Sequence, residues 1–367
     1  MATPTIKSTT PRGLVAVTGG SGYIAGYCIA QLLNEGWRAR TTVRNLGAAE
    51  EVRATIGKIT ANASAIEFKA ADLNSDVGWA DAVAGADYVL HVASPVPTVD
   101  PKSDDELVRP ARDGALVLKA ARDAGVKRVV MTSSTSAIMF GRGVREKPFT
   151  EADWTDEKNR ADTSPYDRAK TIAERAAWTW HKAEGGGLEL VTVNPALVLG
   201  PVLGSDFSAS IKAVRKLLDG SISALPHFGF NVVDVRDIAA LQLLAMTTPL
   251  AAGQRFTGSC DFNWMADIAK ILKQGLGDKA RKVPSISVPN FLVRVIAIFD
   301  PVARGRLYEL GKRRQVSSEK ARAPNPGLDD TARLGDRSRN CQKPSGAGLG
   351  LARVRVIRSY DKSVRTH

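Results

Sequence analysis

Residues 163–170, "TSPYDRAK", place a tyrosine and a lysine four positions apart. On a helix, residues i and i+4 share one face, so Tyr166 and Lys170 would project together. A phenol beside an ammonium group can act as a proton donor whose pKa the cation lowers. Pro165 favours a helix that begins here, because proline fits the first helical position. The strand expected just upstream ends in "MTSSTS" (131–136), so the pair indicates an active site rather than an ordinary surface contact.

A glycine-rich segment, "VTGGSGYIAG" (17–26), joins the expected first strand to the first helix. Glycines let the backbone turn tightly and let a pyrophosphate approach the amides of a helix N-terminus, where the dipole favours an anion. Such a turn alone is weak evidence, but this one follows the first strand of an alternating chain. It predicts a dinucleotide site that uses Gly19 and Gly22. Ala25, where a third glycine often stands, is small enough for close helix packing.

The ends of the next two strands bear on the choice of dinucleotide. Arg44 closes the second expected strand. An arginine there suits the 2′-phosphate of NADP, whereas an acidic residue would bind the ribose of NAD. A solvated arginine at a strand end is the alternative. Asp72, which closes the third strand, could accept a hydrogen bond from the adenine amine or cap a turn. NADP(H) is therefore the preferred cofactor, with NAD(H) possible.

The chain that must position these groups alternates short apolar or β-branched segments with helical patterns. Such alternation predicts βαβ units and a parallel sheet. The fold class is therefore expected to be α/β, a doubly wound parallel-sheet Rossmann domain with a smaller C-terminal substrate domain. Helices should end at Gly36 and Gly125, because glycine favours a helix stop. Six strands are expected, at 14–18, 38–44, 65–70, 88–93, 128–133 and 188–194.

The domain organisation follows from where this alternation weakens. The NAD(P)-binding Rossmann domain is expected at 12–195, completed by about 230–258. Beyond it, ordered elements are expected at 232–246, a strand and a helix, and at 264–276, a helix. The substrate-binding part is expected to comprise 196–229 and 259–322, followed by a non-native or disordered tail at 323–367.

Composition narrows the partners of this 367-residue chain. Its formal net charge is +13, but residues 321–367 contribute +6 of that, so the rest is only mildly basic. No nucleic-acid partner is therefore expected. No apolar run approaches the ~20 residues of a membrane span. The longest, "FLVRVIAIF" (291–299), contains Arg294 and predicts a short buried helix. We expect no membrane partner.

The cysteines and histidines predict neither a metal site nor a disulfide framework. Cys28, Cys260 and Cys341 are few and scattered, which favours a reducing compartment. The N-terminus shows no secretory signal, so we expect a cytoplasmic protein. His91 lies within a strand that should be buried, and it is expected to be a hydrogen-bonded core residue.

Taken in order, several motifs resemble the extended short-chain dehydrogenases/reductases, in the branch of dihydroflavonol reductases, cinnamoyl-CoA reductases and microbial aldehyde reductases. The resemblance covers about residues 12–320 and rests on "VTGGSGYIAG", "TTVRN", "AADL", "HVASPV", "KRVVMTSS", "YDRAK", "NPALVLGP" and "VDVRDIA". It implies a catalytic set of Ser134, Tyr166 and Lys170. It also implies further cofactor contacts at Tyr23, Ile24, Leu73, Val92, Ala93, Ser94 and Pro195.

The chemistry of that set is a carbonyl reduction. A free tyrosine has a pKa of about 10, so an accessible phenolate near neutrality requires about 4 kcal/mol. A nearby ammonium and the positive charge of oxidised nicotinamide are together of that size. Tyr166 would protonate the carbonyl oxygen, and Ser134 would donate a second hydrogen bond to it. Lys170 would lower the tyrosine pKa and hold the nicotinamide ribose.

Two departures from the family pattern narrow the substrate. Flavonoid-reducing members place an asparagine five residues after the catalytic serine, where this chain has Met139, followed by Phe140. The cinnamoyl-CoA branch carries "KNWYCYGK" where this chain has "DTSPYDRAK". The expected substrate is therefore a modest, largely apolar aldehyde or ketone, walled by Met139, Phe140, Phe207 and Phe228.

Two other functions stay open at this point. One is a sugar-nucleotide epimerase or dehydratase, which would use the same serine, tyrosine and lysine with tightly held NAD. The other is a non-catalytic NADP-sensing regulator on the same fold. The protein is expected to be a monomer or a homodimer.

The tail from residue 323 loses helical periodicity and is rich in glycine and arginine. Similar reductases end instead with Leu-Gly-Trp and an amphipathic helix. Codons for Asn325–Gly350, read one base later, permit Thr-Leu-Gly-Trp-Thr-Thr-Arg and then Ala-Arg-Ser-Leu-Leu-Glu-Leu-Gly-Leu. We infer a one-base insertion or deletion near codons 321–324, whether biological or from sequencing. A disordered basic tail is the alternative.

Sequencing the gene across codons 315–350 tests this inference. We expect the shifted frame to spell the amphipathic ending, because several codons in this segment leave only two bases open at the third position. Codons that do not spell it would restore the disordered-tail interpretation.

Overall fold

The computed structural model describes residues 12–94, 104–204 and 208–323, without the side chains of 104–113, 209 and 302. Residues 324–367 of the predicted tail at 323–367 lie outside the described residues, as does Phe207.

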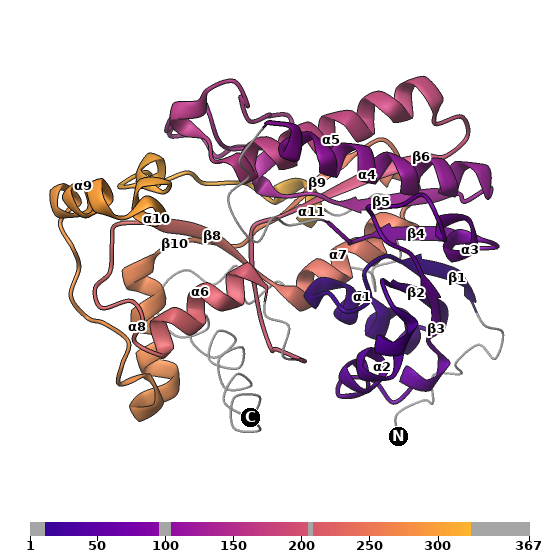
Figure 1. The fold of residues 1–367 in the computed structure, drawn as a ribbon, viewed down its shortest axis with the longest axis horizontal. Coiled ribbons are helices and arrows are strands. Elements are labelled where there is room, and N and C mark those ends of the chain that lie inside the picture. Colours follow the sequence, from indigo (N-terminus) through magenta and orange to yellow (C-terminus); the bar gives the residue numbers. More distant parts are fainter. Residues whose placement is uncertain (1–11, 95–103, 205–207, 324–367) are drawn as a thin grey trace.

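A seven-stranded sheet forms the centre of the protein, in the order β3-β2-β1-β4-β5-β6-β9, and every neighbouring pair is parallel (Figure 1). Its strands are β1 (Arg12–Val17), β2 (Trp37–Val43), β3 (Glu67–Ala70), β4 (Tyr88–His91), β5 (Arg128–Thr132), β6 (Glu189–Pro195) and β9 (Arg255–Gly258). The six predicted strands are confirmed, with ends that differ by at most two residues. The sequence did not predict β9.

Side-chain alternation along β1 explains why this sheet is buried on both faces. Val15 and Val17 belong to one core cluster, whereas Leu14 and Ala16 belong to another. Successive side chains of a strand point to opposite faces, so one apolar strand supplies both cores. A near-continuous apolar run is typical of a parallel strand covered by helices on both sides.

Helices cover both faces of the sheet. The helices α1, α2 and α7 pack on the face that contains Val15 and Val17, and α3, α4 and α5 pack on the other (Figure 1). The glycine stops at Gly36 and Gly125 are confirmed, since both have positive φ just beyond α1 and α4. The helices are α1 (Tyr23–Asn34), α2 (Ala49–Gly57), α3 (Trp79–Val83), α4 (Asp104–Asp123), α5 (Pro165–Glu184), α6 (Ala209–Leu218), α7 (Val235–Thr247), α8 (Met265–Leu276), α9 (Asn290–Phe299), α10 (Pro301–Arg304) and α11 (Glu319–Arg322).

A second sheet of three strands, in the order β10-β8-β7, lies beside the first (Figure 1). Its strands are β7 (Leu197–Leu199), β8 (Gly229–Asp234) and β10 (Phe262–Trp264). The predicted strand and helix at 232–246 and the helix at 264–276 are confirmed as β8 with α7 and as α8. Of these elements, α7 lies against the large sheet, while β8 belongs to the small one. The division into a cofactor domain and a substrate-binding part stays a prediction.

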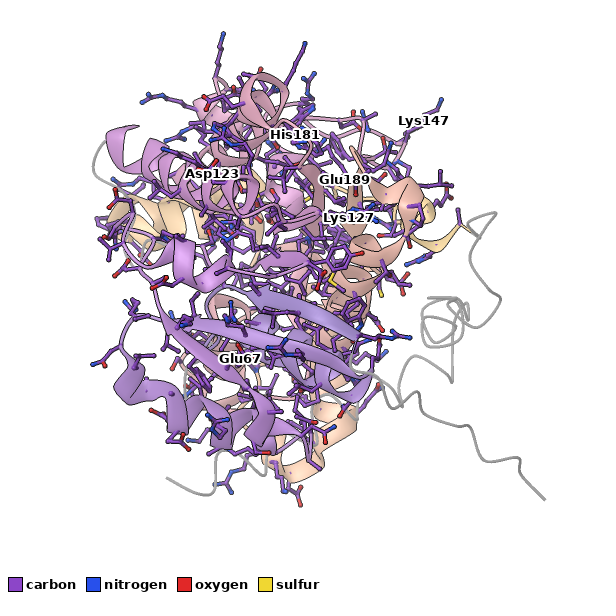
Figure 2. All side chains as sticks on the ribbon, turned by 90° about the vertical axis from the view of Figure 1, so that its right-hand side faces the viewer. Glu67, Asp123, Lys127, Lys147, His181 and Glu189 are labelled. Carbon is purple, nitrogen blue, oxygen red and sulfur yellow. The ribbon has the colours of Figure 1, made fainter. Side chains whose placement is uncertain are left out.

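Arg128 anchors α7 to the large sheet. Its buried guanidinium donates hydrogen bonds to the carbonyl oxygens of Ala245, Met246 and Thr248, at 2.8, 2.9 and 2.6 Å. The last carbonyls of a helix have no partner within the helix, so this arginine satisfies them. On the next strand Glu189 pairs with Arg128 at 2.6 Å. Figure 2 shows Glu189 beside Lys127, whose carbonyl accepts a hydrogen bond from the Glu189 amide.

The helix predicted at 291–299 is present as α9, but the expectation that it is buried is wrong. Only Val293 and Ala297 are buried, and six large apolar side chains of this helix are 41–83% exposed. The sequence shows an apolar helix but not which neighbours cover it. In the part of the chain that the structure describes, no helix is long and apolar enough to cross a bilayer.

Candidate active site

The N-terminus of α5 places Tyr166 and Lys170. Ser164 caps the helix: its hydroxyl accepts a hydrogen bond from the Asp167 amide, and the Asp167 carboxylate accepts one from the Ser164 amide at 2.8 Å. This reciprocal cap fixes where the helix begins. The helix starts at Pro165, as predicted, so Tyr166 lies in the first turn and Lys170 one turn later.

Ser134 lies just beyond the carboxyl end of β5, where ligands of doubly wound sheets bind. Its backbone carbonyl accepts a hydrogen bond from the Asn194 side chain at 3.1 Å. Its hydroxyl accepts one from the Ser136 amide at 3.1 Å, and it lies close enough to Tyr166 to lower the pKa of that phenol. The structure therefore brings the predicted serine and tyrosine hydroxyls together.

Behind this pair lies Glu174, which the sequence analysis missed. The residue is 0% exposed, and its carboxylate accepts hydrogen bonds from Ser133, Thr192, Asn194 and Arg255 at 2.6, 3.0, 2.7 and 2.7 Å. These donors come from β5, β6 and β9, so one buried carboxylate joins three strand ends to α5. Its spacing, one helical turn after Lys170, was the signal that could have identified it.

Lys170 is held between α5 and the end of β4. Its ammonium donates a hydrogen bond to the Ser94 hydroxyl at 2.9 Å. Burial lowers the pKa of Lys170 to about 8. The negative charge of Glu174 acts in the opposite direction and raises this pKa. Burial penalises the charged form of a lysine, so the carboxylate one turn away helps to keep the ammonium protonated near neutral pH.

The surroundings raise the pKa of Tyr166 overall, and the expected lowering of this pKa by Lys170 stays a prediction. Desolvation raises this pKa most, the hydrogen bond from Ser134 lowers it, Asp167 raises it and Arg306 lowers it. The Lys170 Nζ atom lies 5.9 Å from the centroid of the tyrosine ring. A raised pKa keeps the phenol protonated, which is the form that a proton donor needs. The residue is still 39% exposed and can be reached by a substrate.

His91 is a hydrogen-bonded core residue, as predicted. Its Nδ1 atom lies 3.0 Å from the Thr18 hydroxyl, which also accepts hydrogen bonds from the amides of Val92 and Ala93. The Thr18 hydroxyl therefore donates its proton to Nδ1 of His91. Because Nδ1 accepts this hydrogen bond, the ring proton is on Nε2. Burial and then the charge of Lys170 lower the pKa of His91 to about 4, so the ring is neutral at physiological pH.

A pocket of about 330 Å³, which includes space open to solvent, lies beside these groups. It is lined by residues from α5 and from the carboxyl ends of β3, β4 and β5 and the residues that follow them, among them Leu73, His91, Ala93, Ser94, Ser133 and Lys170. Three predicted cofactor residues, Leu73, Ala93 and Ser94, therefore share one pocket with Lys170. Among the described residues, no group of three His, Cys, Asp or Glu side chains is arranged to hold a metal ion.

The glycine-rich turn is shaped to admit a pyrophosphate. Gly22 is the N-cap of α1 and provides no side-chain hydrogen bond, so the first amides of this helix are left for a ligand. Gly19 has φ +72°, and its amide donates a hydrogen bond to the Thr42 hydroxyl at 2.9 Å. A Cβ on Gly20 would lie 2.4 Å from the Thr41 hydroxyl, so the turn must pass β2 without a side chain. These residues fit a bound dinucleotide.

Arg44 and Asp72 follow β2 and β3 on the same edge of the sheet. Arg44 is exposed, and no hydrogen bond or ion pair of its side chain is found among residues 12–94, 104–204 and 208–323. Asp72 makes a turn, since its Oδ1 atom accepts hydrogen bonds from the amide and the side chain of Asn74 at 2.9 and 2.8 Å. The turn function that the sequence left open for Asp72 is thus present.

The remaining predicted cofactor residues lie near the same edge. Tyr23 and Ile24 begin α1 and are partly buried against the core, so their backbone amides rather than their side chains face the pyrophosphate position. Val92 follows β4 and is also partly buried. Pro195, the last residue of β6, is buried and pairs with Gly258 of β9.

The predicted apolar substrate wall is not brought together as one surface. Phe140 is buried, with its ring 5.7 Å from that of Tyr308 and beneath the guanidinium of Arg314. Met139 packs against a small buried cluster. Phe228 is half-buried before β8, and Phe207 lies outside the described residues. Phe140 is therefore a core residue rather than part of a substrate wall, because the later segment that contains Tyr308 covers its ring.

That later segment contacts α5 directly. The Tyr308 hydroxyl donates a hydrogen bond to the Asp167 carboxylate at 2.9 Å, next to Tyr166. Asp162, just before α5, pairs with Lys312 at 2.6 Å and with Arg314. The sequence analysis missed these contacts because they join segments about 140 residues apart.

Comparison with known proteins identifies related chains. A family model described as the NAD dependent epimerase/dehydratase family matches residues 15–257. The chain is 35% identical over 263 residues to tetraketide alpha-pyrone reductase 2 of Arabidopsis thaliana, with 70% of this chain and 81% of the relative covered. It is 37% identical over 243 residues to cinnamoyl-CoA reductase 1 of the same plant, with 65% and 68% covered.

A solved structure shares the fold. The yeast methylglyoxal/isovaleraldehyde reductase Gre2, complexed with NADPH, matches with a TM-score of 0.73 at 21% sequence identity. The match covers 95% of this chain and 99% of that one. At this identity the likeness establishes the fold alone.

Gly20→Ala tests the glycine-rich turn. The new Cβ would overlap the buried Thr41 side chain, so the turn must move. Its backbone amides would then no longer point at the position expected for the pyrophosphate. We expect dinucleotide affinity, measured by fluorescence titration, to fall at least about tenfold, the equivalent of one lost hydrogen bond. Gly187→Ala is the matched control, since nothing lies within 4 Å of its Cβ position. Equal affinity in both variants would contradict the assignment.

Proposed function

The chain belongs to the NAD dependent epimerase/dehydratase family, and from that premise we propose that it is an NADPH-dependent reductase of a modest, largely apolar aldehyde or ketone, with Tyr166 as general acid. The relatives that match over most of its length are named as reductases, and this chain is an NADP-dependent oxidoreductase. The observation that carries the proposal is that Ser134 lies close enough to Tyr166 to affect its pKa, with Lys170 one turn along the same helix, at the carboxyl ends of parallel strands.

Residues of this chain that would hold the cofactor surround the pair. The amides at the start of α1 would bind the pyrophosphate, and Arg44 would bind the 2′-phosphate. Lys170 and Ser94 would bind the nicotinamide ribose in the pocket that they line. When bound, NADPH supplies the hydride for the carbonyl carbon.

The proton comes from this chain. Tyr166, kept protonated by its raised pKa, donates its phenolic proton to the carbonyl oxygen as negative charge develops there. Ser134 donates a second hydrogen bond to the same oxygen. The hydrogen bond from the Asn194 side chain to the Ser134 carbonyl holds the serine in position. Lys170 stabilises the phenolate that remains, since its ammonium lies on the same helix face.

The substrate class rests on what surrounds the site. Met139 stands where flavonoid-reducing relatives place an asparagine, so no amide is present there to bind catechol hydroxyls. Met139 is partly exposed, so it supplies apolar surface at that position. A small apolar carbonyl compound therefore fits better than a polyphenol.

Tyr166→Phe tests the proton donor. Removal of the hydroxyl should lower kcat by at least the ~10²-fold typical of a lost general acid, while NADPH binding persists. The measurement is NADPH oxidation at 340 nm with a panel of aldehydes and ketones. Tyr88→Phe, a half-buried tyrosine on β4, should leave kcat unchanged. Near-normal turnover in Tyr166→Phe would refute the assignment.

Arg44→Asp tests the cofactor choice. The change replaces a phosphate partner with a ribose acceptor and adds charge repulsion against the 2′-phosphate, so preference should turn toward NADH. The measure is the ratio of kcat/KM for NADPH to that for NADH. Arg281→Asp, at another exposed arginine, controls for the change in net charge. A ratio that matches the control would make Arg44 an ordinary surface residue.

A further inference from the structure

The helix α9 exposes an apolar face that nothing in the described protein covers. Its large apolar side chains are between 41% and 83% exposed: Phe291, Leu292, Val295, Ile296, Ile298 and Phe299. At 3.6 residues per turn, these six fall within about 160° of the helix circumference. The two buried residues, Val293 and Ala297, lie on the opposite side and attach the helix to the protein.

A face of this kind is unusual on a surface helix. Such helices normally place their apolar stripe toward the core and polar residues toward water, whereas α9 does the reverse. Arg294 is the one charged side chain between Asn290 and Phe299, and it lies at the edge of the apolar stripe. Exposed apolar patches of this size mark interaction sites.

The position of α9 leaves this face accessible. The helix lies at the left-hand edge of the molecule in Figure 1, and α10 is beside it. The last described helix, α11, lies instead in the middle of the molecule against β9. The described chain thus ends at a different part of the molecule from α9.

We propose that this face binds the same face of a second copy of the chain, with α9 antiparallel to its partner across a two-fold axis at Val295. An isologous contact requires a self-complementary surface, in which residue i meets j and j meets i. With the axis at Val295, Phe291 meets Phe299 of the partner subunit and Leu292 meets Ile298 of the partner subunit. Aromatic thus packs on aromatic and aliphatic on aliphatic at both ends of the helix.

The area available agrees with the centre of a stable dimer interface. The six side chains together expose on the order of 500 Å² of apolar surface per copy. A standard interface buries about 800 Å² per partner, with an apolar centre and a polar rim. The apolar centre is therefore present in full, and neighbouring polar residues such as Arg294 would form the rim.

A lipid surface is the less favoured occupant. Helices that lie on membranes carry several Lys or Arg side chains on a polar face. The face of α9 opposite its apolar stripe is packed on the protein through Val293 and Ala297 instead. A membrane-bound helix would therefore lack the charges that hold it at a headgroup layer.

The oligomeric state of the full chain tests the proposal, by sedimentation velocity in 0.15 M salt. We expect a dimer for the wild type. Val295→Glu and Val295→Lys should each be monomeric, because each places two like charges against one another at the axis, which weakens dimerisation at least about 100-fold. An equimolar mixture of the two variants should dimerise again, because opposite charges then meet at the axis.

A matched variant separates this contact from a general effect of an added surface charge. Val77→Glu, at another exposed valine, should remain dimeric. The wild-type thermal midpoint and NADPH turnover should persist in both position-295 variants, since that side chain is exposed and outside the site. A monomeric wild type, a dimeric Val295→Glu, or a mixture that fails to dimerise would each overturn the proposal. So would a monomeric wild type that binds phosphatidylcholine/phosphatidylserine vesicles through α9.

Discussion

The buried carboxylate of Glu174 is the interaction on which the rest of the site depends. It accepts hydrogen bonds from Ser133, Asn194 and Arg255, among others, and so ties α5 to the ends of three strands. A buried carboxylate is tolerated only when its oxygens accept hydrogen bonds or pair with a cation. Removal of one partner from a buried ion pair typically lowers the free energy of unfolding by about 3–5 kcal/mol. Ser134 directly follows Ser133, and Lys170 and Tyr166 lie one and two helical turns before Glu174 on α5. Their geometry is therefore set by a group that need not touch the substrate.

The same low-polarity surroundings set the protonation states. Burial lowers the pKa of Lys170 to about 8 and that of His91 to about 4, and it raises the pKa of Tyr166. Each shift disfavours a charge, as desolvation does. The result is a neutral histidine, a protonated tyrosine, and a lysine that stays largely protonated at neutral pH because Glu174 opposes its desolvation. A proton donor beside one cation suits a reaction in which negative charge develops on a carbonyl oxygen.

The smaller part of the protein is attached at this same point. Burial would raise the pKa of Asp162, but Lys312 and Arg314 outweigh it and lower the pKa, so the carboxylate is charged and paired. Tyr308 adds a hydrogen bond to Asp167 in the first turn of α5. The N-terminus of α5 is thus held from both sides, by the large sheet and by the later segment. A substrate that enters beside Tyr166 would meet both.

The sequence by itself determined the parallel α/β architecture, the glycine-rich turn and the capped helix with Tyr166 and Lys170, because these depend on local patterns of polarity, glycine and proline. Only the tertiary structure decided the contacts between distant segments. It placed Glu174 among donors from three strands, buried Phe140 beneath a segment far along the chain, and left α9 uncovered. Periodicity shows that a helix has an apolar face. Which surface covers that face, and how far burial moves a pKa, depends on neighbours that the local sequence does not contain.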